Sequence, residues 1–507
     1  MKRTTISLLA TATALAAITG FASLTAPGDG TAAGPAAAAR LPVERSSLLC
    51  PAPSGSETAE TRYTSFTPKG TAGRGGGTGR GTAELRPSAG APAGESTDVM
   101  RPDAKVPAAK PLLTLKEPGT PGAAEESGAK TPALVGTATG RLAPGWTAQQ
   151  TTTVTAGSAR GVLGLSCTAP DTEFWIPGAS TAEGRQDYVH LTNPDDSPAV
   201  VDLELYGKDG ELQTTLTEGI PLRPGAGLPI MLSTLTAEIA PDVTVHVSTR
   251  AGRVGAAVHA AEDKAGSDWI SGAADPAPAQ VLPGIPADAT SVRLIVFAPG
   301  RNDADLKIEL AGPTGRIVPA GGETLHVKSG MTAGLELGDV TKGEAGSLIL
   351  TPESADRATP VVAALRVARG KGEKQEIAFI PATAPVGERA SVSDNREAGT
   401  TLSLTAPTTA ARVRVTASAG TEGGEPAVKS YTVKAGTTLA VTPPVPAGLK
   451  GSYALTVETE SGGPVHAART LELPERKIPM FTVQTLPDDR GTVSVPRAGQ
   501  DLSVLDD

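Results

Sequence analysis

The chain has 507 residues, which exceeds a single hydrophobic core and suits three or four domains, and its net charge of −9 gives no general attraction to nucleic acid or anionic lipid. Glycine and proline account for 59 and 44 residues, together about a fifth of the chain against roughly 12% in an average protein. With aromatic residues at only 3%, this composition disfavours long helices and is typical of β-sheets with cores of small and β-branched side chains.

Residues 1–39 have the features of a secretory signal peptide. A cationic start at Met1–Arg3 precedes an apolar run from Ile6 to Leu24, and small residues up to Arg40 offer cleavage sites. The apolar run is also long enough to span a membrane, so an uncleaved N-terminal anchor is the alternative. We expect the rest of the chain to be secreted or, in the alternative, to face outward from the cytoplasmic membrane.

The only two cysteines, Cys50 and Cys167, allow a single pairing. In an oxidising compartment an even cysteine count predicts a disulfide. The bridge would close a small β-domain over residues 40–170. Within it, about residues 68–130 form a low-complexity insertion rich in glycine and proline, which we expect to be mostly disordered with at most a short strand in Pro111–Glu117.

Downstream of this domain the sequence repeats three times, with a period of about 104 to 108 residues. Four markers recur in the same order: a proline, a glycine 13 residues later, a turn glycine before an apolar strand, and an alanine in a later strand. They are Pro194, Gly207, Gly225 and Ala256; Pro299, Gly312, Gly330 and Ala363; and Pro407, Gly420, Gly436 and Ala467. We therefore expect repeats over residues 171–279, 280–384 and 385–507, the last including C-terminal strands.

Strand-like alternation follows the proline in each repeat. In the first repeat Val201, Leu203 and Leu205 share one face and polar residues share the other, which indicates a half-buried strand. In the third repeat Val413 and Val415 are out of step by one residue, counted from the proline. A slip of one residue inverts a strand's faces, so either the turn there differs in length or the alignment fails.

The predicted fold is all-β, a tandem array of immunoglobulin-like β-sandwich domains. Units of about a hundred residues with short strands and turns rich in glycine and proline favour this architecture. A propeller is the structural competitor, but its blades repeat at about 40 to 50 residues.

Catalytic and metal-binding motifs are not found in the sequence. The five histidines, His190, His246, His259, His326 and His466, have no metal-ligand spacing, and we expect all five on strand surfaces. The acidic turn at Asp195–Asp196 resembles that at Asn302–Asp303, but Thr408–Thr409 replaces it in the third repeat. Turn formation explains this pattern better than calcium does. We therefore expect no catalytic residue, metal or cofactor.

Aromatic side chains concentrate in the first repeat, where Trp175, Tyr188, Tyr206 and Trp269 form a candidate ligand surface. Phe174 and Trp175 are adjacent, so in a strand one of them faces outward. Such residues could stack on a glycan. The alternative, which we favour, is that they form the aromatic core of that unit.

Three stretches carry a resemblance to a known family: "SLLCP", "GLSCTAPDTEFWIPGAS" and "LTNPDDSPAVVDLELYGKDG". Together they resemble secreted actinobacterial proteins known only as a domain of unknown function. The resemblance implies an extracytoplasmic protein and brings no activity, ligand or catalytic residue.

Three functions remain open. We favour a secreted, non-enzymatic structural or interaction protein of the cell envelope, whose partner could be an envelope protein or a cell-wall polymer. The second hypothesis is a glycan-binding or wall-polymer-binding module. The third, a hydrolase with residues converging from different units, requires a cleft lined by a close carboxylate pair or by a histidine with a nucleophile.

Overall fold

The computed structural model describes residues 38–70, 80–88, 110–157 and 159–496. Almost all regular structure there is β-strand, as the composition predicts, and the tandem β-sandwich fold class is confirmed. Among these residues no helix is long and apolar enough to cross a membrane. The predicted signal segment lies outside the described residues except for its last two positions.

The chain divides into two compact units. The smaller one, Met1–Leu41 with Val493–Asp507, contains a two-stranded sheet of β1 (Ala39–Pro42) and β38 (Thr492–Val495). The larger one, Pro42–Thr492, holds four sandwiches, each made of two antiparallel sheets. We call them the N-terminal sandwich and the first, second and third repeats.

The N-terminal sandwich pairs two four-stranded sheets. One sheet contains, in order, β2 (Arg45–Cys50), β7 (Leu134–Thr139), β4 (Ala83–Pro87) and β5 (Leu113–Leu115). The other contains β6 (Gly122–Ser127), β3 (Glu60–Phe66), β8 (Thr147–Val154) and β9 (Gly161–Ser166).

The first repeat pairs a five-stranded and a four-stranded sheet. The larger sheet contains β10 (Glu173–Ala179), β16 (Val243–Ala251), β12 (Ala199–Gly207) and β13 (Gly210–Glu211), with β14 (Ile220–Leu222) also on β12. The smaller contains β15 (Gly227–Met231), β11 (Arg185–Thr192), β17 (Gly255–Glu262) and β18 (Gly266–Ile270).

The second repeat has the same plan. Its larger sheet contains β19 (Gln280–Ile285), β25 (Gly346–Pro352), β21 (Ala304–Ala311) and β22 (Arg316–Ile317), with β23 (Thr324–Val327) also on β21. Its smaller sheet contains β24 (Thr332–Gly338), β20 (Ala289–Phe297), β26 (Val362–Arg369) and β27 (Glu376–Pro381).

The third repeat extends its larger sheet by one strand. That sheet contains β28 (Arg389–Asn395), β35 (Tyr453–Gly462), β30 (Ala411–Gly420), β31 (Gly423–Glu425) and β34 (Ala447–Lys450), with β32 (Ala427–Val433) also on β30. The smaller contains β33 (Thr437–Val441), β29 (Thr400–Ala406), β36 (His466–Glu472) and β37 (Phe481–Thr485). Short 3₁₀ turns occur at Gly140–Leu142, Leu232–Thr234, Ala355–Arg357 and Gly372–Lys374.

The repeat markers occupy equivalent places in the three repeats. The turn glycines Gly225, Gly330 and Gly436 adopt φ angles of 66°, 69° and 68°, in the left-handed region that favours glycine. The marker alanines pair across the smaller sheets with core residues: Leu191 with Ala256, Val296 with Ala363, and Leu404 with Ala467. The repeats read from the sequence are therefore structural repeats.

The register of the third repeat is explained by a shorter turn and a bulge. Strand β30 begins one residue sooner after its proline than β12 and β21 do, so Val413 and Val415 still face the core. A register shift between Ala417 and Gly420 then inserts an extra residue opposite β35 and restores the spacing to the marker glycine.

The N-terminal sandwich is built like the repeats, and the expected insertion is partly structured. Strands β4, β5 and β6 lie within residues 68–130, and Leu85, Leu113 and Leu115 are buried. The expectation of mostly disordered chain is therefore wrong for residues 83–87 and 122–127, and the strand predicted in Pro111–Glu117 is confirmed as β5. Strands β4 and β5 are five and three residues long, and β6 (GAAEES) has no buried residue, so none of them carries a long apolar alternation. Residues 71–79 and 89–109 lie outside the described residues.

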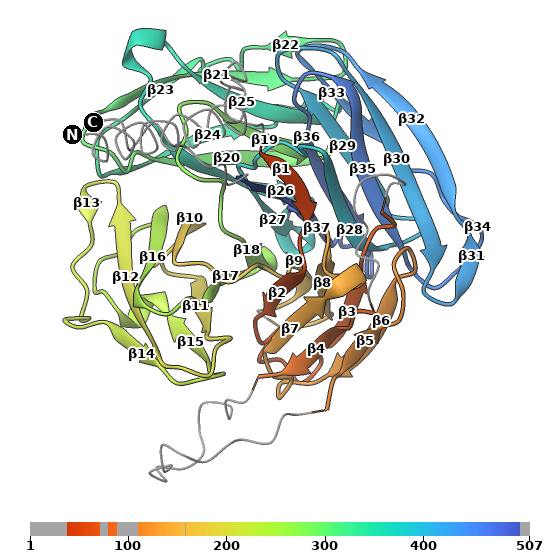
Figure 1. The fold of residues 1–507 in the computed structure, drawn as a ribbon. Helices are drawn as coiled ribbons and strands as arrows, with labels where there is room; N and C mark the ends of the chain where they lie inside the picture. The colour runs from red at the N-terminus through yellow and green to blue at the C-terminus, as the bar shows by residue number, and fades with distance from the viewer. Residues whose placement is uncertain (1–37, 71–79, 89–109, 158, 497–507) are drawn as a thin grey trace, which may run out of the picture. The chain divides into compact units, whose positions relative to one another are not determined.

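Each sandwich has one four-stranded sheet that ends in β9, β18, β27 or β37, and these four end strands meet one another. Strand β18 contacts β9 and β27, and β37 contacts β27 and β9, so the four sandwiches form a closed cycle (Figure 1). Glycines allow this close approach: a Cβ at Gly164 on β9 would collide with the side chain of Thr482 on β37. We call these four strands the central strands.

A buried carboxyl group joins three of the central strands. Asp268 on β18 is 1% exposed and accepts a hydrogen bond from the backbone N–H of Gly164 (3.0 Å). The Thr482 hydroxyl donates to both of its oxygens (3.2 and 3.1 Å). Burial raises the pKa of Asp268 well above its usual value, and Glu376 on β27 raises it further.

The four joints between sandwiches differ in chemistry. Apolar side chains fill three of them: Leu163 meets Trp269, Phe379 joins the core of the first repeat, and Phe481 joins the core of the second. The joint that closes the cycle, between the third repeat and the N-terminal sandwich, is polar. There Ser393 donates its backbone N–H to Gln149 Oε1 (2.7 Å), and its hydroxyl bonds that of Thr64 (2.7 Å).

Replacing Asp268 tests the central contact. In Asp268→Leu the Gly164 N–H and the Thr482 hydroxyl lose their acceptor, and a buried unsatisfied group costs about 1–3 kcal/mol. We expect the free energy of unfolding, measured by urea denaturation, to fall by about that amount. Asp268→Asn keeps a carbonyl acceptor and should lose much less; equal losses in both variants would contradict this role.

The pH dependence of stability tests the neighbouring acid. Glu376 is fully buried, with Oε2 at 3.5 Å from Nε of Arg160, and burial raises its pKa from 4.5 to about 8 although Arg160 lowers it. Between these values the unfolded chain binds fewer protons, so the free energy of unfolding should decrease as pH rises from 5 to 8. Glu376→Gln removes this contribution, so the variant should gain stability relative to wild type across that range. A pH-independent difference would show that the acid is ionised in the folded protein.

Candidate functional site

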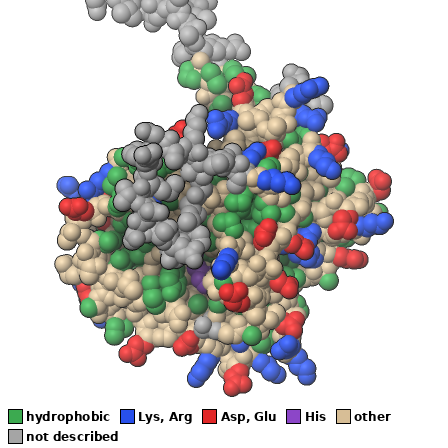
Figure 2. Space-filling model, turned by 90° about the horizontal axis from the view of Figure 1, so that it is seen from below, with side chains coloured by type: hydrophobic (Ala, Val, Ile, Leu, Met, Phe, Trp, Pro, Cys, Tyr) green, Lys and Arg blue, Asp and Glu red, His purple; other side chains and the backbone are tan. Residues whose placement is uncertain are grey.

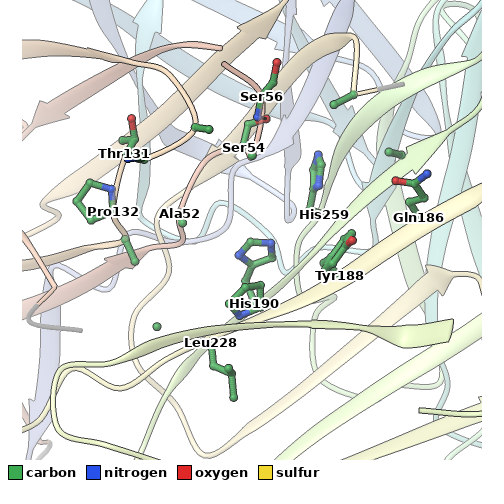
Figure 3. Close-up of a pocket in the computed structure, with 18 of the residues that line it drawn as sticks. Ala52, Ser54, Ser56, Thr131, Pro132, Gln186, Tyr188, His190, Leu228 and His259 are labelled. Carbon is green, nitrogen blue, oxygen red and sulfur yellow. Dashed lines mark hydrogen bonds between the residues drawn. The ribbon is translucent and has the colours of Figure 1, made fainter. Parts of the chain in front are cut away.

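A cavity of about 670 Å³ lies between the N-terminal sandwich and the first repeat (Figure 3). Its volume is within the roughly 300–1,000 Å³ of small-molecule sites. One side is the outer face of the sheet β15-β11-β17-β18, and the other is made by loops of the N-terminal sandwich. Both sides belong to the Pro42–Thr492 unit.

The sheet side follows from strand alternation. On β11 the residues Gln186, Tyr188, His190 and Thr192 line the cavity, while Val189 between them lies in the core of the first repeat. Antiparallel pairing with β17 sets His259 opposite Tyr188. A continuous polar and aromatic surface therefore forms on one face of the sheet.

The loop side comes from the β2–β3, β6–β7 and β8–β9 connections, which carry Ser54 and Ser56, residues 129–133, and residues 156, 157 and 159. Cys50 ends β2 and forms the predicted disulfide with Cys167, just after β9. The bridge thus holds the start of the β2–β3 loop against the sandwich.

The cavity lining is nearly uncharged. Within the described part of the chain it contains no aspartate or glutamate, and Lys130 is its single charged residue. Lys130 is exposed, and the remaining polar groups are hydroxyls, an amide and imidazoles.

Two histidines lie side by side at the cavity. The rings of His190 and His259 are edge-on with centroids 6.4 Å apart, and Trp269 lies 5.0 and 5.3 Å from them. Burial lowers the pKa of His190 to about 3, with a further decrease from His259, and that of His259 to about 4. Both imidazoles are therefore neutral near pH 7, and each offers one donor and one acceptor.

One buried polar atom of the cavity lining is left without a protein partner. Across the described residues, the Nε2 atom of His259 is buried without a hydrogen bond. Buried polar groups normally have a partner, so this nitrogen is available to a ligand in the cavity.

The expectation of five surface histidines is wrong for His466, which is 9% exposed and donates from Nδ1 to the Thr383 carbonyl (2.9 Å). His190 and His259 are half-buried and line the cavity. Alternation places His190 and His259 on outward strand faces, as predicted. The N-terminal sandwich covers those faces, and the local sequence contains no signal that predicts this.

The four aromatic residues of the predicted ligand surface are divided between two sheets. Tyr188 lines the cavity, and Trp269, 3% exposed, lies behind it in the joint with the N-terminal sandwich. Trp175 and Tyr206 lie on the other sheet, on β10 and β12. One residue of the predicted set, Tyr188, is therefore presented to the cavity.

Trp175 is covered on its strand face. Its ring stacks on that of His246, with centroids 3.7 Å apart and an interplanar angle of 9°. The ring centroid of Phe297, from the second repeat, lies 5.3 Å from that of Trp175. Phe297 also contacts Tyr206, at 4.6 Å. Trp175 and Tyr206 thus contribute to the joint between the first and second repeats.

The carboxylates of the acidic turns contact neighbouring turns. Asp195 forms an ion pair with Arg253 (3.0 Å), and Asp303 of the corresponding turn accepts the backbone N–H of Ser329 (2.8 Å). The local turn-forming contact is made by Asn193, whose Oδ1 accepts the backbone N–H of Asp195 (3.0 Å). No group of three potential metal ligands occurs among the residues the structure describes.

Comparison with known proteins identifies the family. A family of unknown function, DUF5719, matches residues 122–444, more than half of the chain. The chain belongs to this family. The DUF5719 match begins at β6 and includes the whole sheet side of the cavity, whereas the β2–β3 loop precedes it. No curated protein matches the chain.

The disulfide should carry much of the stability of the N-terminal sandwich. Its cysteines are 117 residues apart, and the loop-entropy model gives about 4–5 kcal/mol for such a loop as an upper value. We expect Cys50→Ser with Cys167→Ser to lower the free energy of unfolding by up to this amount. Intact-mass analysis of the purified protein should show a gain of two protons on reduction; two free thiols before reduction would contradict the bridge.

Proposed function

We propose that the protein is a non-enzymatic binding protein of the cell envelope, acting outside the cytoplasmic membrane with the cavity as its binding site. The observation that supports this most is the buried Nε2 atom of His259, a residue of the cavity lining, which has no hydrogen-bond partner within the described residues. A rigid frame that presents loops over a sheet face is a common arrangement of binding sites.

Two features favour binding over catalysis. No histidine nitrogen is hydrogen-bonded to a serine or cysteine side chain in the described residues, and the pairs that do form join histidines to carboxylates or a carbonyl. Asp268 and Glu376, the acid that raises its pKa, are buried among the central strands and do not line the cavity. The hydrolase hypothesis needs a cleft lined by a close carboxylate pair or by a histidine with a nucleophile.

The extracytoplasmic location is supported by chemistry. A disulfide persists in oxidising compartments, and the N-terminal sequence has the pattern of an export signal. On the face shown in Figure 2 acidic and basic side chains are interspersed, without an extended patch of one sign. Attraction by surface charge alone is therefore a weak basis for envelope binding, and the cavity is the better candidate.

Retention on purified cell walls of the source organism tests the proposal. We expect the wild-type protein to co-sediment with the walls and Tyr188→Ala to be retained at least tenfold less, because that ring forms part of the cavity surface. His326→Ala, an exposed residue of the second repeat whose side chain is 53% exposed, is the matched control and should behave as wild type.

The outcomes separate the two parts of the proposal. Failure of the wild-type protein to bind the walls would contradict a wall-binding role. Equal retention of wild type and Tyr188→Ala would show that the envelope is bound through another surface.

A further inference from the structure

We propose that the cavity binds a neutral saccharide, with Tyr188 against a sugar face and the two imidazoles and the loop hydroxyls bonded to its hydroxyl groups. This inference rests on the proposed function, because it names the chemical class of the ligand for the same site. It follows from the charge, the hydrogen-bonding groups and the apolar surface of the lining.

The charge of the lining selects against ionic ligands. An anion such as a phosphate is normally held by several arginines, lysines or helix N-termini, and a cation by carboxylates. Here Lys130 is the single charged residue among the described lining residues, and it is exposed at the loop side. A neutral ligand leaves no unpaired charge in the cavity.

The hydrogen-bonding groups match hydroxyls. A neutral imidazole presents a donor and an acceptor, and each serine, threonine or tyrosine hydroxyl does the same. His190 and His259 on the sheet side are thus combined with Ser54 and Thr131 on the loop side (Figure 3). Each of these two hydroxyls makes one bond within its own loop and keeps capacity for a bond to a ligand. A polyhydroxylated ligand is itself a donor and an acceptor at every hydroxyl, so it can satisfy both sides.

The apolar part of the lining suits the face of a sugar ring. Tyr188 and Pro229 lie on adjacent strands of the sheet side, because pairing sets Pro229 on β15 opposite His190 on β11. An aromatic ring gives a large contact area with few rotatable bonds, and its hydroxyl remains available for a polar contact.

An extended peptide is a poorer fit. A peptide that adds to a sheet edge needs free backbone donors, and Pro229 on the edge strand β15 has none. The loop side includes another proline, Pro132. These positions reduce the main-chain bonds that would bind a strand.

The test uses immobilised neutral oligosaccharides of hexoses, pentoses and N-acetylhexosamines, each with a sulfated or carboxylated counterpart. We expect the full-length exported protein to bind at least one neutral probe in preference to its charged counterpart. In Tyr188→Ala and His190→Ala the affinity, measured by calorimetry, should fall at least tenfold. His326→Ala should leave it unchanged.

Controls keep the result interpretable. Near-ultraviolet circular dichroism and the thermal midpoint of each variant establish that it folds, and Tyr188→Phe, which retains the ring, should keep most of the affinity. Preference for the charged probes, or neutral binding unaffected by both substitutions, would overturn the inference. If no saccharide binds while wall retention still depends on Tyr188, the ligand class is wrong and the proposed function stands; loss of both refutes both.

Discussion

The meeting of the four central strands is the constraint on which the rest of the structure depends. Asp268 accepts hydrogen bonds from β9 and β37 while belonging to β18, so its carboxyl group connects three sandwiches within a few ångströms. Buried donors without an acceptor are costly, and therefore these strands cannot separate without exposing or orphaning polar groups. The cavity depends on the same contact, since its two sides belong to sandwiches joined through β9 and β18.

The joints between consecutive sandwiches differ chemically from the joint that closes the cycle. Apolar clusters join consecutive sandwiches, with polar contacts such as the Arg366–Glu262 ion pair beside them, whereas Gln149, Thr64 and Ser393 close the cycle with hydrogen bonds. Polar closure requires the partners to be aligned before it becomes favourable, because an imperfectly paired buried group is penalised. The three apolar joints supply this alignment by bringing the third repeat back to the N-terminal sandwich.

Much of this architecture could be predicted from the sequence, because it depends on local pattern. The alternation around Val201 predicts a half-buried strand, Gly225 predicts a left-handed turn, and the cysteine count predicts the bridge. The cavity could not be predicted, because it combines Ser54 with His259, which are distant in sequence and come from different sandwiches. Strand alternation predicts an outward face for His190, but tertiary packing decides whether another sandwich covers that face. The same limit applies to Trp175, whose outward ring stacks on His246 and contacts Phe297 of the next repeat.

Scanning calorimetry tests the central claim, that the four sandwiches behave as one body, most directly. Because each joint buries surface shared by two sandwiches, the account predicts a single cooperative transition whose calorimetric enthalpy equals the van't Hoff enthalpy. Independent sandwiches would unfold separately, and two or more resolved transitions, each with the enthalpy of about a hundred residues, would contradict the account.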